Sequence, residues 1–266
     1  MRHTSEISSN EAAWDIASQK YTAKDELEKD IQLLREGGST LLPTEISELG
    51  ALDGVDLAIH LCCSHGSDVL SMLNHGAKRV CGIDISQEML SLAQQKTEAL
   101  NANASWVHAD VLDSQPQLQS KADLVYTGRG GLPWVRDLDL WAERVSELLK
   151  SEGKLYIFEG HPLNWIWKRD TKNWQVKRSY FQNEPLPNED FPAMAVEQYT
   201  GKGSDSPMAF EWQWTIADTV SAISKAGLKV EFLHEHPFNF WPLFDEISPL
   251  QDGLVPQSFS LLATKA

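Results

Sequence analysis

The sequence predicts an α/β fold in which a seven-stranded, mostly parallel β-sheet carries helices on both faces. The first observation behind this prediction is an alternation. Short runs rich in apolar, β-branched and aromatic residues recur along the chain, with segments of helical periodicity between them. The second observation is the composition: a chain of 266 residues that is 42% hydrophobic and 23% charged is typical of a globular protein with a large core.

Seven segments have the length and composition of strands. Each is short, mostly apolar, and bounded by turn-forming or polar residues. They cover residues 57–62, 79–84, 104–108, 122–127, 154–159, 228–234 and 258–263. Because helix-type segments separate most of these strands, we expect most neighbours in the sheet to run parallel.

Four helices are expected between the strands, at residues 67–75, 86–100, 137–150 and 215–226. Ser86 precedes Gln87-Glu88, which suits an N-cap with an acidic first turn. Apolar residues recur in the second and third of these helices at roughly helical spacing, so we expect them to pack on the sheet.

Two stretches fall outside the alternation. Residues 1–50 are polar with a helical pattern, so we expect an N-terminal helical cap, followed by a main domain over residues 51–266. Residues 160–214 are interrupted by prolines and by Gly201-Lys202-Gly203. An irregular stretch of this length is usually functional, and we expect a lid or substrate-binding insertion.

The charge of the chain limits its partners. It has 38 acidic and 23 basic side chains, a formal charge of −15, which disfavours binding to nucleic acid or to an anionic membrane. No apolar run resembles a signal peptide or a membrane span. Only three cysteines occur, two of them adjacent, so no disulfide framework is expected and we predict a cytoplasmic protein. The sequence does not indicate the oligomeric state.

The turn after the first strand is the first place to look for a ligand, because ligands bind beyond the carboxyl ends of parallel strands. Gly66 lies in this turn, and Asp84 ends the second strand 18 residues later. A carboxylate at this distance is well placed to accept hydrogen bonds from the ribose hydroxyls of an adenosine-containing cofactor.

Two cofactors compete for this arrangement. A dinucleotide such as NAD needs the pattern G-x-G-x-x-G where its pyrophosphate approaches the backbone, and this turn offers only Gly66. S-adenosylmethionine has no phosphate, and backbone groups or short polar side chains such as Cys63, Ser64 and His65 can hold its amino-acid end. The turn therefore favours S-adenosylmethionine.

Further motifs follow in order along the chain. They are His60-Leu61 through Cys63 with Gly66 and Asp68, Gly82-Ile83-Asp84-Ile85-Ser86, Asp110-Val111, Asp123-Leu124-Val125-Tyr126-Thr127, Trp134, Glu159-Gly160-His161-Pro162, Phe210-Glu211-Trp212, Ala226-Gly227-Leu228 and His234-Glu235-His236. This set resembles class I S-adenosylmethionine-dependent methyltransferases, and more narrowly a bacterial small-molecule subgroup whose first motif reads His-Leu-x-Cys. The resemblance covers residues 55–266 and implies a Rossmann-like sheet with an antiparallel last strand.

The resemblance also assigns a cofactor site. It implies that the methionine end is held by His60, Cys62, Ser64 and Gly66, the ribose by Asp84 with Ile85, and the adenine side by Asp110 with Val111. Trp14 and Tyr21 resemble an aromatic cap over the cofactor, and Tyr126 completes the expected cofactor site. The sequence departs from the general class at His60, where an acid is usual, and at Cys62 and Ser64, where glycines are usual.

Other interpretations of these residues exist. Two histidines and two cysteines between residues 60 and 65 are zinc-ligand types, but strand alternation separates Cys63 from His60 and Cys62, so we expect no metal. Asp84 and Asp110 are also compatible with ordinary turn positions.

The predicted function is S-adenosylmethionine-dependent methyl transfer to a small-molecule acceptor. His161 is the first candidate for a base, followed by Glu159 and His236. The acceptor is expected near Tyr126 and under the 160–214 insertion, with binding by Arg129, Trp134 and Trp165. Arg129 could instead pair with the cofactor carboxylate. The alternatives are an S-adenosylmethionine-binding protein without catalysis and an NAD-dependent oxidoreductase.

Overall fold

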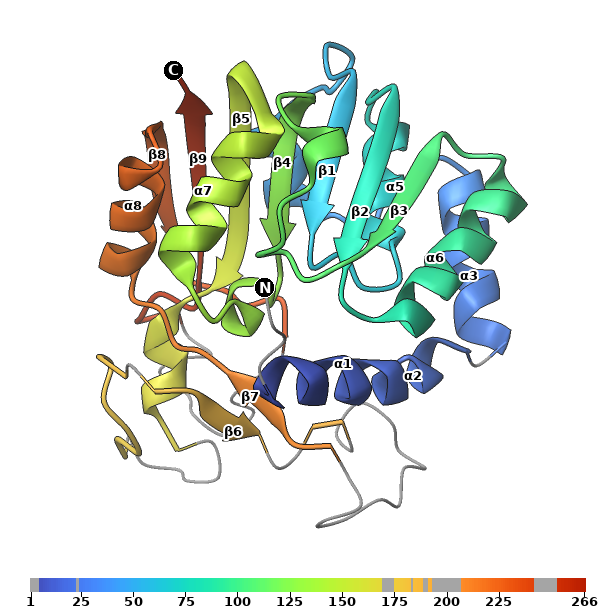
Figure 1. Cartoon of the computed structure of the whole chain (residues 1–266). Helices are drawn as coiled ribbons and strands as arrows, with labels where there is room; N and C mark the ends of the chain where they lie inside the picture. The colour runs from blue at the N-terminus through green and yellow to red at the C-terminus, as the bar shows by residue number, and fades with distance from the viewer. Residues whose placement is uncertain are drawn as a thin grey trace.

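A seven-stranded sheet lies at the centre of the computed structural model, with strand order β3-β2-β1-β4-β5-β9-β8 (Figure 1). The structure describes residues 5–22, 24–168, 175–182, 184–188, 191–192, 207–241 and 253–266. The strands of this sheet are β1 (Leu57–Leu61), β2 (Arg79–Asp84), β3 (Ala104–His108), β4 (Ala122–Gly128), β5 (Leu149–Gly160), β8 (Leu228–His236) and β9 (Ser258–Lys265). Strands β1 to β5 pair in parallel, and β9 is antiparallel to both β5 and β8. The predicted fold class is confirmed, including the antiparallel last strand.

Four strands are longer than the sequence predicts: β4 by one residue, β8 and β9 by two, and β5 at both ends. β5 begins directly after the preceding helix rather than at residue 154, and β8 continues to His236 rather than ending at residue 234. Pairing with β9 explains the extension of β8, because β9 pairs with β8 as far as His236 and Ser258. The polar residues of β8 lie on an edge strand, where apolar periodicity does not reveal their pairing.

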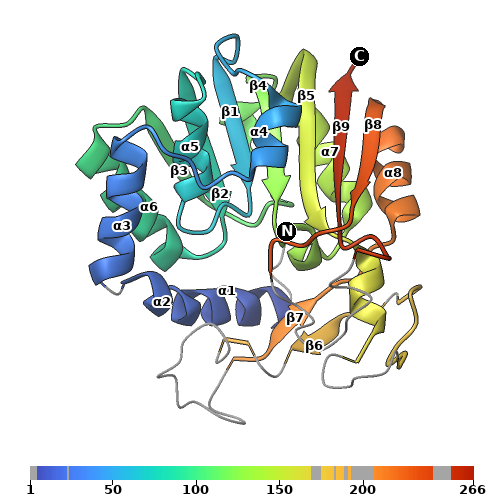
Figure 2. The ribbon, with the colours of Figure 1, turned by 180° about the vertical axis from the view of Figure 1, so that it is seen from behind.

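Helices cover the two faces of the sheet (Figure 2). α7 (Leu138–Leu148) and α8 (Ile216–Lys225) lie on one face, while α4 (Pro43–Leu49), α5 (Ser67–Asn74) and α6 (Gln87–Leu100) lie on the other. The cap predicted at Ser86 forms, because its hydroxyl accepts a hydrogen bond from the Met89 amide at 3.1 Å.

Strand alternation divides the core into two layers. In β1, Ile59 packs in the layer with the fully buried Trp141 of α7, while its neighbour Ala58 packs in the layer with Met72 of α5. His60 shares the side of Ala58, and its imidazole packs against the ring of Tyr126 with 4.6 Å between centroids. A titratable side chain is therefore inserted into the second layer, at the end of the strand that leads to the site.

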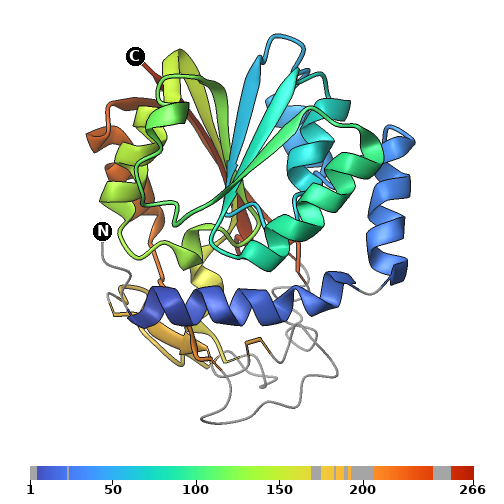
Figure 3. The ribbon, with the colours of Figure 1, turned by 45° about the vertical axis from the view of Figure 1, so that its right-hand side comes forward.

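Three helices precede this domain: α1 (Ser5–Ala17), α2 (Gln19–Thr22) and α3 (Lys24–Arg35). α1 and α2, called the roof below, run across the carboxyl edge of the sheet, and α3 packs beside α5 and α6 (Figure 3). Asn10 fixes the roof by two hydrogen bonds to the backbone of Phe210, one accepted by the Phe210 carbonyl at 2.9 Å and one donated by its amide at 2.7 Å.

The described part of the 160–214 segment contains little regular structure. It has a short helix η3 (Pro162–Ile166) and a separate antiparallel pair, β6 (Leu186–Asn188) with β7 (Ala209–Glu211), and β7 lies against α1. Two other short 3₁₀ helices are η1 (Pro116–Leu118) and η2 (Leu132–Trp134). Within the parts of the chain described above, no helix is both long and apolar enough to span a bilayer.

Candidate functional site

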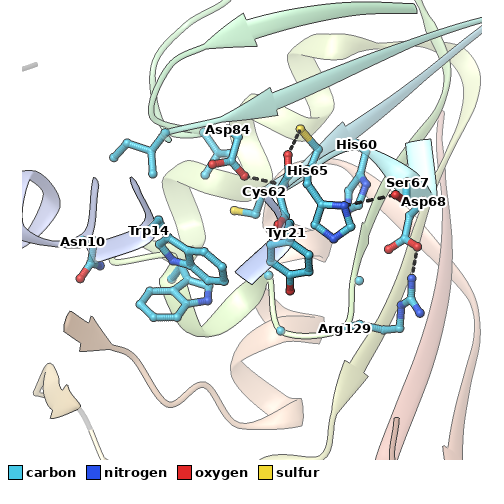
Figure 4. A pocket seen from close by; sticks show the side chains of 18 of the residues that line it. Asn10, Trp14, Tyr21, His60, Cys62, His65, Ser67, Asp68, Asp84 and Arg129 are labelled. Atoms are coloured by element: carbon cyan, nitrogen blue, oxygen red, sulfur yellow. Dashed lines mark hydrogen bonds and ion pairs between the residues drawn. The ribbon is translucent and has the colours of Figure 1, made fainter. Parts of the chain in front are cut away.

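A cavity of about 460 Å³ lies between the carboxyl edge of the sheet and the roof (Figure 4). Its walls come from the turn after β1, the end of β2, the turns after β3 and β4, and the roof. β1 is flanked by β2 and β4, so the cavity lies where the strand order reverses, which is the usual ligand position in such sheets.

Asp84, at the end of β2, is the buried acid at one end of this cavity. Its carboxylate accepts hydrogen bonds from the amides of Ser64 at 2.7 Å and Ser86 at 2.9 Å. Burial raises the pKa of Asp84 to about 6, although these amides favour the charged form. Asp84 therefore connects the two turns that border the cavity and lies against the space where a ligand would bind.

The turn after β1 has non-glycine residues in backbone conformations that glycine usually adopts, which costs conformational free energy. Cys62 and Ser64 have φ values of 57° and 49°, the left-handed region that glycine usually occupies. At Gly66, with φ of 79°, a side chain is also excluded sterically, because a Cβ atom would lie 2.5 Å from the Trp106 ring. The strained residues line the cavity, which fits the tendency of such conformations to occur at functional sites.

Asp110, beyond β3, is the second acid on this side of the cavity. One oxygen accepts a hydrogen bond from the Leu112 amide at 2.9 Å, and the other pairs with Arg136 at 2.5 Å. Ile85 and Val111 line the wall beside the two acids. Apolar surface next to buried acceptors is the arrangement expected for a nucleoside.

Aromatic side chains close the cavity from the roof. Trp14 packs edge to face against Trp134, with 5.1 Å between centroids, and lies 4.9 Å from the ring of Phe191. Tyr21 stacks on His65 at 4.0 Å. These contacts join the roof to the domain.

The opposite end of the cavity is polar and charged. Arg129 pairs with Asp68 of α5, and its guanidinium also donates to the Thr40 carbonyl at 2.9 Å. The Arg129 Nε atom lies 3.8 Å from the buried carboxylate of Glu45. His60 lies at the same end, and burial lowers its pKa to about 4, so this imidazole is neutral at pH 7.

A buried lysine anchors α3 beside the cavity. The Lys96 ammonium, on a side chain only 1% exposed, contacts the Asp30 carboxylate at 2.7 Å, the His65 ring at 2.6 Å and the Ser67 hydroxyl at 2.6 Å. Burial disfavours the imidazolium form of His65, and the neighbouring Lys96 disfavours it further, so the pKa of His65 falls to about 4. Three helices and the turn after β1 therefore meet at one ammonium group.

Most of the predicted site residues meet at this cavity. Eleven residues that were expected to bind the cofactor or the acceptor line the cavity together. They are Trp14, Tyr21, His60, Cys62, Ser64, Asp84, Ile85, Asp110, Val111, Arg129 and Trp134. Among the residues that the structure describes, no group of three or more His, Cys, Asp or Glu side chains is arranged to hold a metal ion.

The prediction of Glu159 as a base is not supported by its position. Its carboxylate accepts hydrogen bonds from the amides of Gly130 at 2.7 Å, Leu132 at 3.0 Å and Gly160 at 2.8 Å. Burial raises its pKa to about 7. Glu159 thus shapes the turn after β4 and is not among the residues that line the cavity.

His161 and His236 are also misplaced for the predicted base. The His161 Nδ1 atom accepts a hydrogen bond from the Leu163 amide at 3.1 Å, and Nε2 donates to Glu235 at 2.9 Å, so both ring nitrogens are occupied outside the cavity. His236 stacks on Phe158 with 5.4 Å between centroids, and it bonds to Ser260 at 2.9 Å.

Replacing His161 by alanine should lower the free energy of unfolding by about 1 kcal/mol, the usual effect of losing a side-chain cap, here on η3. Binding of S-adenosylhomocysteine, followed by calorimetry, should change by less than about twofold because the side chain does not reach the cavity. Normal binding combined with complete loss of methyl transfer would return His161 to a catalytic role.

Three further predicted site residues are not among those that line the cavity. Tyr126 lies behind His60 and donates its hydroxyl to the buried Glu45 at 2.5 Å, so it supports the floor and does not line the cavity. Gly66 is the N-cap of α5 and provides room for Trp106. Trp165, on η3, is not part of the cavity wall either.

The sequence reasoning missed several residues of the cavity wall. They are Ile7, Asn10, Lys20, Glu26, Thr40, Ser67, Asp68, Phe240 and Trp241, together with the backbone of the turn after β4. Asp68 had a signal, since it belongs to the first motif and lies in the first turn of α5. Most of the others come from segments that reach the site only through tertiary packing.

The strands that build the cavity are similar to those of known proteins. Residues 58–153, from β1 into β5, match a family described as Methyltransferase domain. A solved S-adenosylmethionine dependent methyltransferase from Mesorhizobium loti is similar, with a TM-score of 0.62 at 21% identity over 84% of this chain and 96% of that chain. A SAM-dependent methyltransferase structure from Methanosarcina mazei has a TM-score of 0.59 at 18% identity, over 85% and 98% of the two chains.

One curated relative is an uncharacterised protein of Haemophilus influenzae, 24% identical over 168 residues, or 59% of this chain. The chain spans 65% of the length of that relative. The solved structures share the fold, and the family match covers the strands that build the cavity. The family match agrees with the predicted enzyme class, a methyltransferase.

Proposed function

We propose that this protein transfers a methyl group from S-adenosylmethionine to a small-molecule acceptor. The observation that carries the proposal is the buried Asp84 carboxylate at the reversal point of a methyltransferase-type sheet, facing a cavity with an apolar wall. The family match over residues 58–153 supports the reaction class.

The residues present fit this cofactor. Asp84 would accept the ribose hydroxyls, Asp110 lies on the side expected for the adenine, and Ile85, Val111 and Trp14 offer apolar surface for the base. The turn after β1 has the wrong composition for a pyrophosphate, since Cys62 and Ser64 carry side chains where a dinucleotide needs open backbone. An NAD-dependent oxidoreductase is therefore disfavoured.

When bound, S-adenosylmethionine supplies an activated methyl group on a sulfonium, so the protein must mainly align an acceptor and exclude water. The roof, with the contacts among Trp14, Trp134 and Phe191, would help to keep water out of the cavity. The three predicted bases lie outside the cavity, which favours an acceptor that needs little help with proton removal.

A small acceptor fits the enclosure better than a macromolecule. The roof covers the carboxyl edge of the sheet, and a cavity of about 460 Å³ must hold the cofactor and its acceptor. The formal charge of −15 also disfavours a nucleic-acid acceptor.

The proposal is tested by incubating the protein with S-adenosylmethionine and fractionated metabolites while measuring the release of S-adenosylhomocysteine. Release that depends on a metabolite fraction and disappears in Asp84→Ala supports the proposal. Tight cofactor binding without release in any fraction would favour the alternative, a binding protein without catalysis.

Cofactor binding should also depend on pH in a defined direction. The pKa of Asp84 is raised to about 6 in the free protein, and ribose hydroxyls donate best to its ionised form, so affinity should increase as the pH rises from 5 to 7. The affinity should increase up to about tenfold between pH 5 and pH 7, because near pH 5 Asp84 must release one proton when the cofactor binds. His60 and His65, with pKa values of about 4, stay neutral across this range.

Calorimetric titration with S-adenosylhomocysteine at several pH values measures this dependence. The matched variant is Asp84→Asn, which keeps the shape but cannot ionise, and its affinity should vary much less between pH 5 and 7. A curve for the variant that parallels that of the wild-type protein would assign the proton to another group.

A further inference from the structure

Two side chains of the cavity wall also reach the solvent and mark its opening. Lys20, in α2, is exposed, and Trp241, beyond β8, is 51% exposed, yet both line the cavity. The Lys20 ammonium lies 5.5 Å from the centroid of the Tyr21 ring and 6.0 Å from that of the Trp241 ring. Lys20, Tyr21, Phe240 and Trp241, called the rim below, therefore combine one cation with aromatic surfaces from distant parts of the chain.

The charge of Lys20 is not neutralised by the protein. Among the residues that the structure describes, no carboxylate forms an ion pair with its ammonium group. Arg129 also lines the cavity but is paired with Asp68, and the carboxylate of Glu26 pairs with Lys29 at 2.7 Å. Lys20 is thus the cation of the wall that is available to a negatively charged ligand.

Tyr21 adds a hydrogen-bond donor beside this cation. Its hydroxyl has no hydrogen-bond partner in the described structure. Burial raises the pKa of the phenol, and the carboxylates of Asp30 and Asp68 raise it further, so the hydroxyl keeps its proton at neutral pH. His60, whose ring nitrogens also lack partners there, is only 2% exposed and lies deep in the cavity rather than at the rim.

Trp241 gives the rim an apolar surface that is only half covered. Contact of this large side chain with water costs free energy that a ligand packed against it would recover. Phe240 continues the surface inward, with its ring centroid 6.0 Å from that of Trp241 and 6.2 Å from that of Phe158. Planar rings pack well on aromatic side chains, so a flat ligand would gain more here than a bulky one.

The rim lies beside the part of the cavity where methyl transfer is expected. Figure 4 shows Tyr21 further along the cavity than Asp84 and Trp14. With the ribose beside Asp84, the sulfonium of the cofactor would lie beyond the nucleoside, on the side toward Tyr21. A ligand at the rim would therefore be close to the transferable methyl group, as an acceptor must be.

We propose that the methyl acceptor is a planar organic anion held at the rim by Lys20, Tyr21 and Trp241. The Lys20 ammonium pairs with the anionic group, the Tyr21 hydroxyl donates a hydrogen bond to the same group, and the flat body of the acceptor packs against Trp241 and Phe240. A protein with a formal charge of −15 repels anions in general, so an anionic substrate needs a local cation. The inference rests on the proposed function, because it assumes that the cavity holds S-adenosylmethionine.

A matched pair of aromatic probes tests the charge of the acceptor. 2-Naphthoate is a planar anion, and 2-naphthamide has the same rings without the charge. In calorimetry with saturating S-adenosylhomocysteine, 2-naphthoate should bind the wild-type protein roughly three- to tenfold more tightly, between the effects of an exposed ion pair and of a charge-assisted hydrogen bond. Equal affinities, or no binding of either probe, would overturn the inference.

The variant Lys20→Met removes the charge and keeps an unbranched side chain. The preference for 2-naphthoate should disappear in this variant and persist in Lys20→Arg, and the affinity for S-adenosylhomocysteine should change by less than about twofold in both. The matched control is Lys229→Met, which removes the same charge from an exposed lysine outside the cavity and should keep the preference.

The variant Trp241→Leu tests the flat surface separately. It should weaken 2-naphthoate roughly two- to tenfold, the usual effect of losing an aromatic contact, and change cyclohexanecarboxylate by less than about twofold. Equal losses for the two carboxylates would contradict recognition of a planar acceptor.

The remaining outcomes separate the two proposals. A preference for 2-naphthoate that survives in Lys20→Met would assign charge recognition to another group and overturn the inference. A loss of S-adenosylhomocysteine affinity in Lys20→Met as large as the loss of 2-naphthoate affinity would place Lys20 at the cofactor, which also overturns it. Failure of the wild-type protein to bind S-adenosylhomocysteine would contradict the proposed function itself.

Discussion

Replacing Asp84 by alanine should weaken the binding of S-adenosylhomocysteine about tenfold or more, since a charge-assisted hydrogen bond in a buried site is worth roughly 1.5–3 kcal/mol. The substitution also leaves the amides of Ser64 and Ser86 without their acceptor, so the free energy of unfolding should fall by about 1–3 kcal/mol. Calorimetry measures the first effect and urea denaturation the second.

Asp123 provides a matched control for Asp84. It accepts two backbone hydrogen bonds in the same way, from Asp56 at 2.9 Å and Leu57 at 3.0 Å, but it lies at the other end of β4, away from the cavity. Asp123→Ala should therefore lower stability without changing cofactor affinity. Equal losses of affinity in the two variants would mean that Asp84 acts only through the fold.

Replacing Lys96 by methionine should lower the free energy of unfolding by about 3 kcal/mol, the lower end of the range for breaking a buried ion pair, because Asp30 keeps 27% exposure. The change leaves Asp30, His65 and Ser67 without the ammonium that joins α3 and α6 to the turn after β1. Urea denaturation measures the loss.

Lys225→Met is the comparison for Lys96. Its ion pair with Asp139 joins two exposed side chains, 66% and 58% accessible, and exposed pairs contribute at most about 1 kcal/mol. A loss in Lys96→Met no larger than in Lys225→Met would show that the buried cluster contributes little to holding α3 in place.

The fold was predictable because the information for it is local and periodic. Each strand of the parallel sheet is a short apolar run, and the helices carry an apolar stripe and recognisable caps such as Ser86. The apolar runs indicate where β1 and β2 end, so the position of Asp84 at the cavity could be inferred from chain order and topology.

The three predicted bases lie outside the cavity lining for a physical reason. Chain order places Glu159 and His161 near the carboxyl end of β5, but it does not give the direction of a side chain whose hydrogen-bond partners are distant in sequence. Glu159 accepts hydrogen bonds from the amides of Gly130 and Leu132, and His161 is hydrogen-bonded to Glu235, which is 74 residues away. Satisfying these buried groups outweighed access to the cavity.

The charged end of the cavity could not be predicted for a related reason. Thr40, Asp68 and Arg129 come from three segments, and although Asp68 lies in the first motif and Arg129 was expected in the site, nothing in the sequence pairs them with each other. Their combination exists only after α4, α5 and β4 have packed together, with Arg129 bonding to a carbonyl 89 residues away. His60, by contrast, was predicted for this site from the first motif, although its lack of hydrogen-bond partners was not.

The hydrogen bonds between Asn10 and Phe210 join parts of the chain that a ribosome makes at very different times. The two residues are 200 positions apart, so at roughly 5–20 residues per second Asn10 is made about 10–40 s before its partner. Strands β1 to β5, residues 57–160, are made within that interval, before the roof can be fastened to β7. Cofactor capture is therefore expected to be a late event in biosynthesis, available only after β7 has left the exit tunnel.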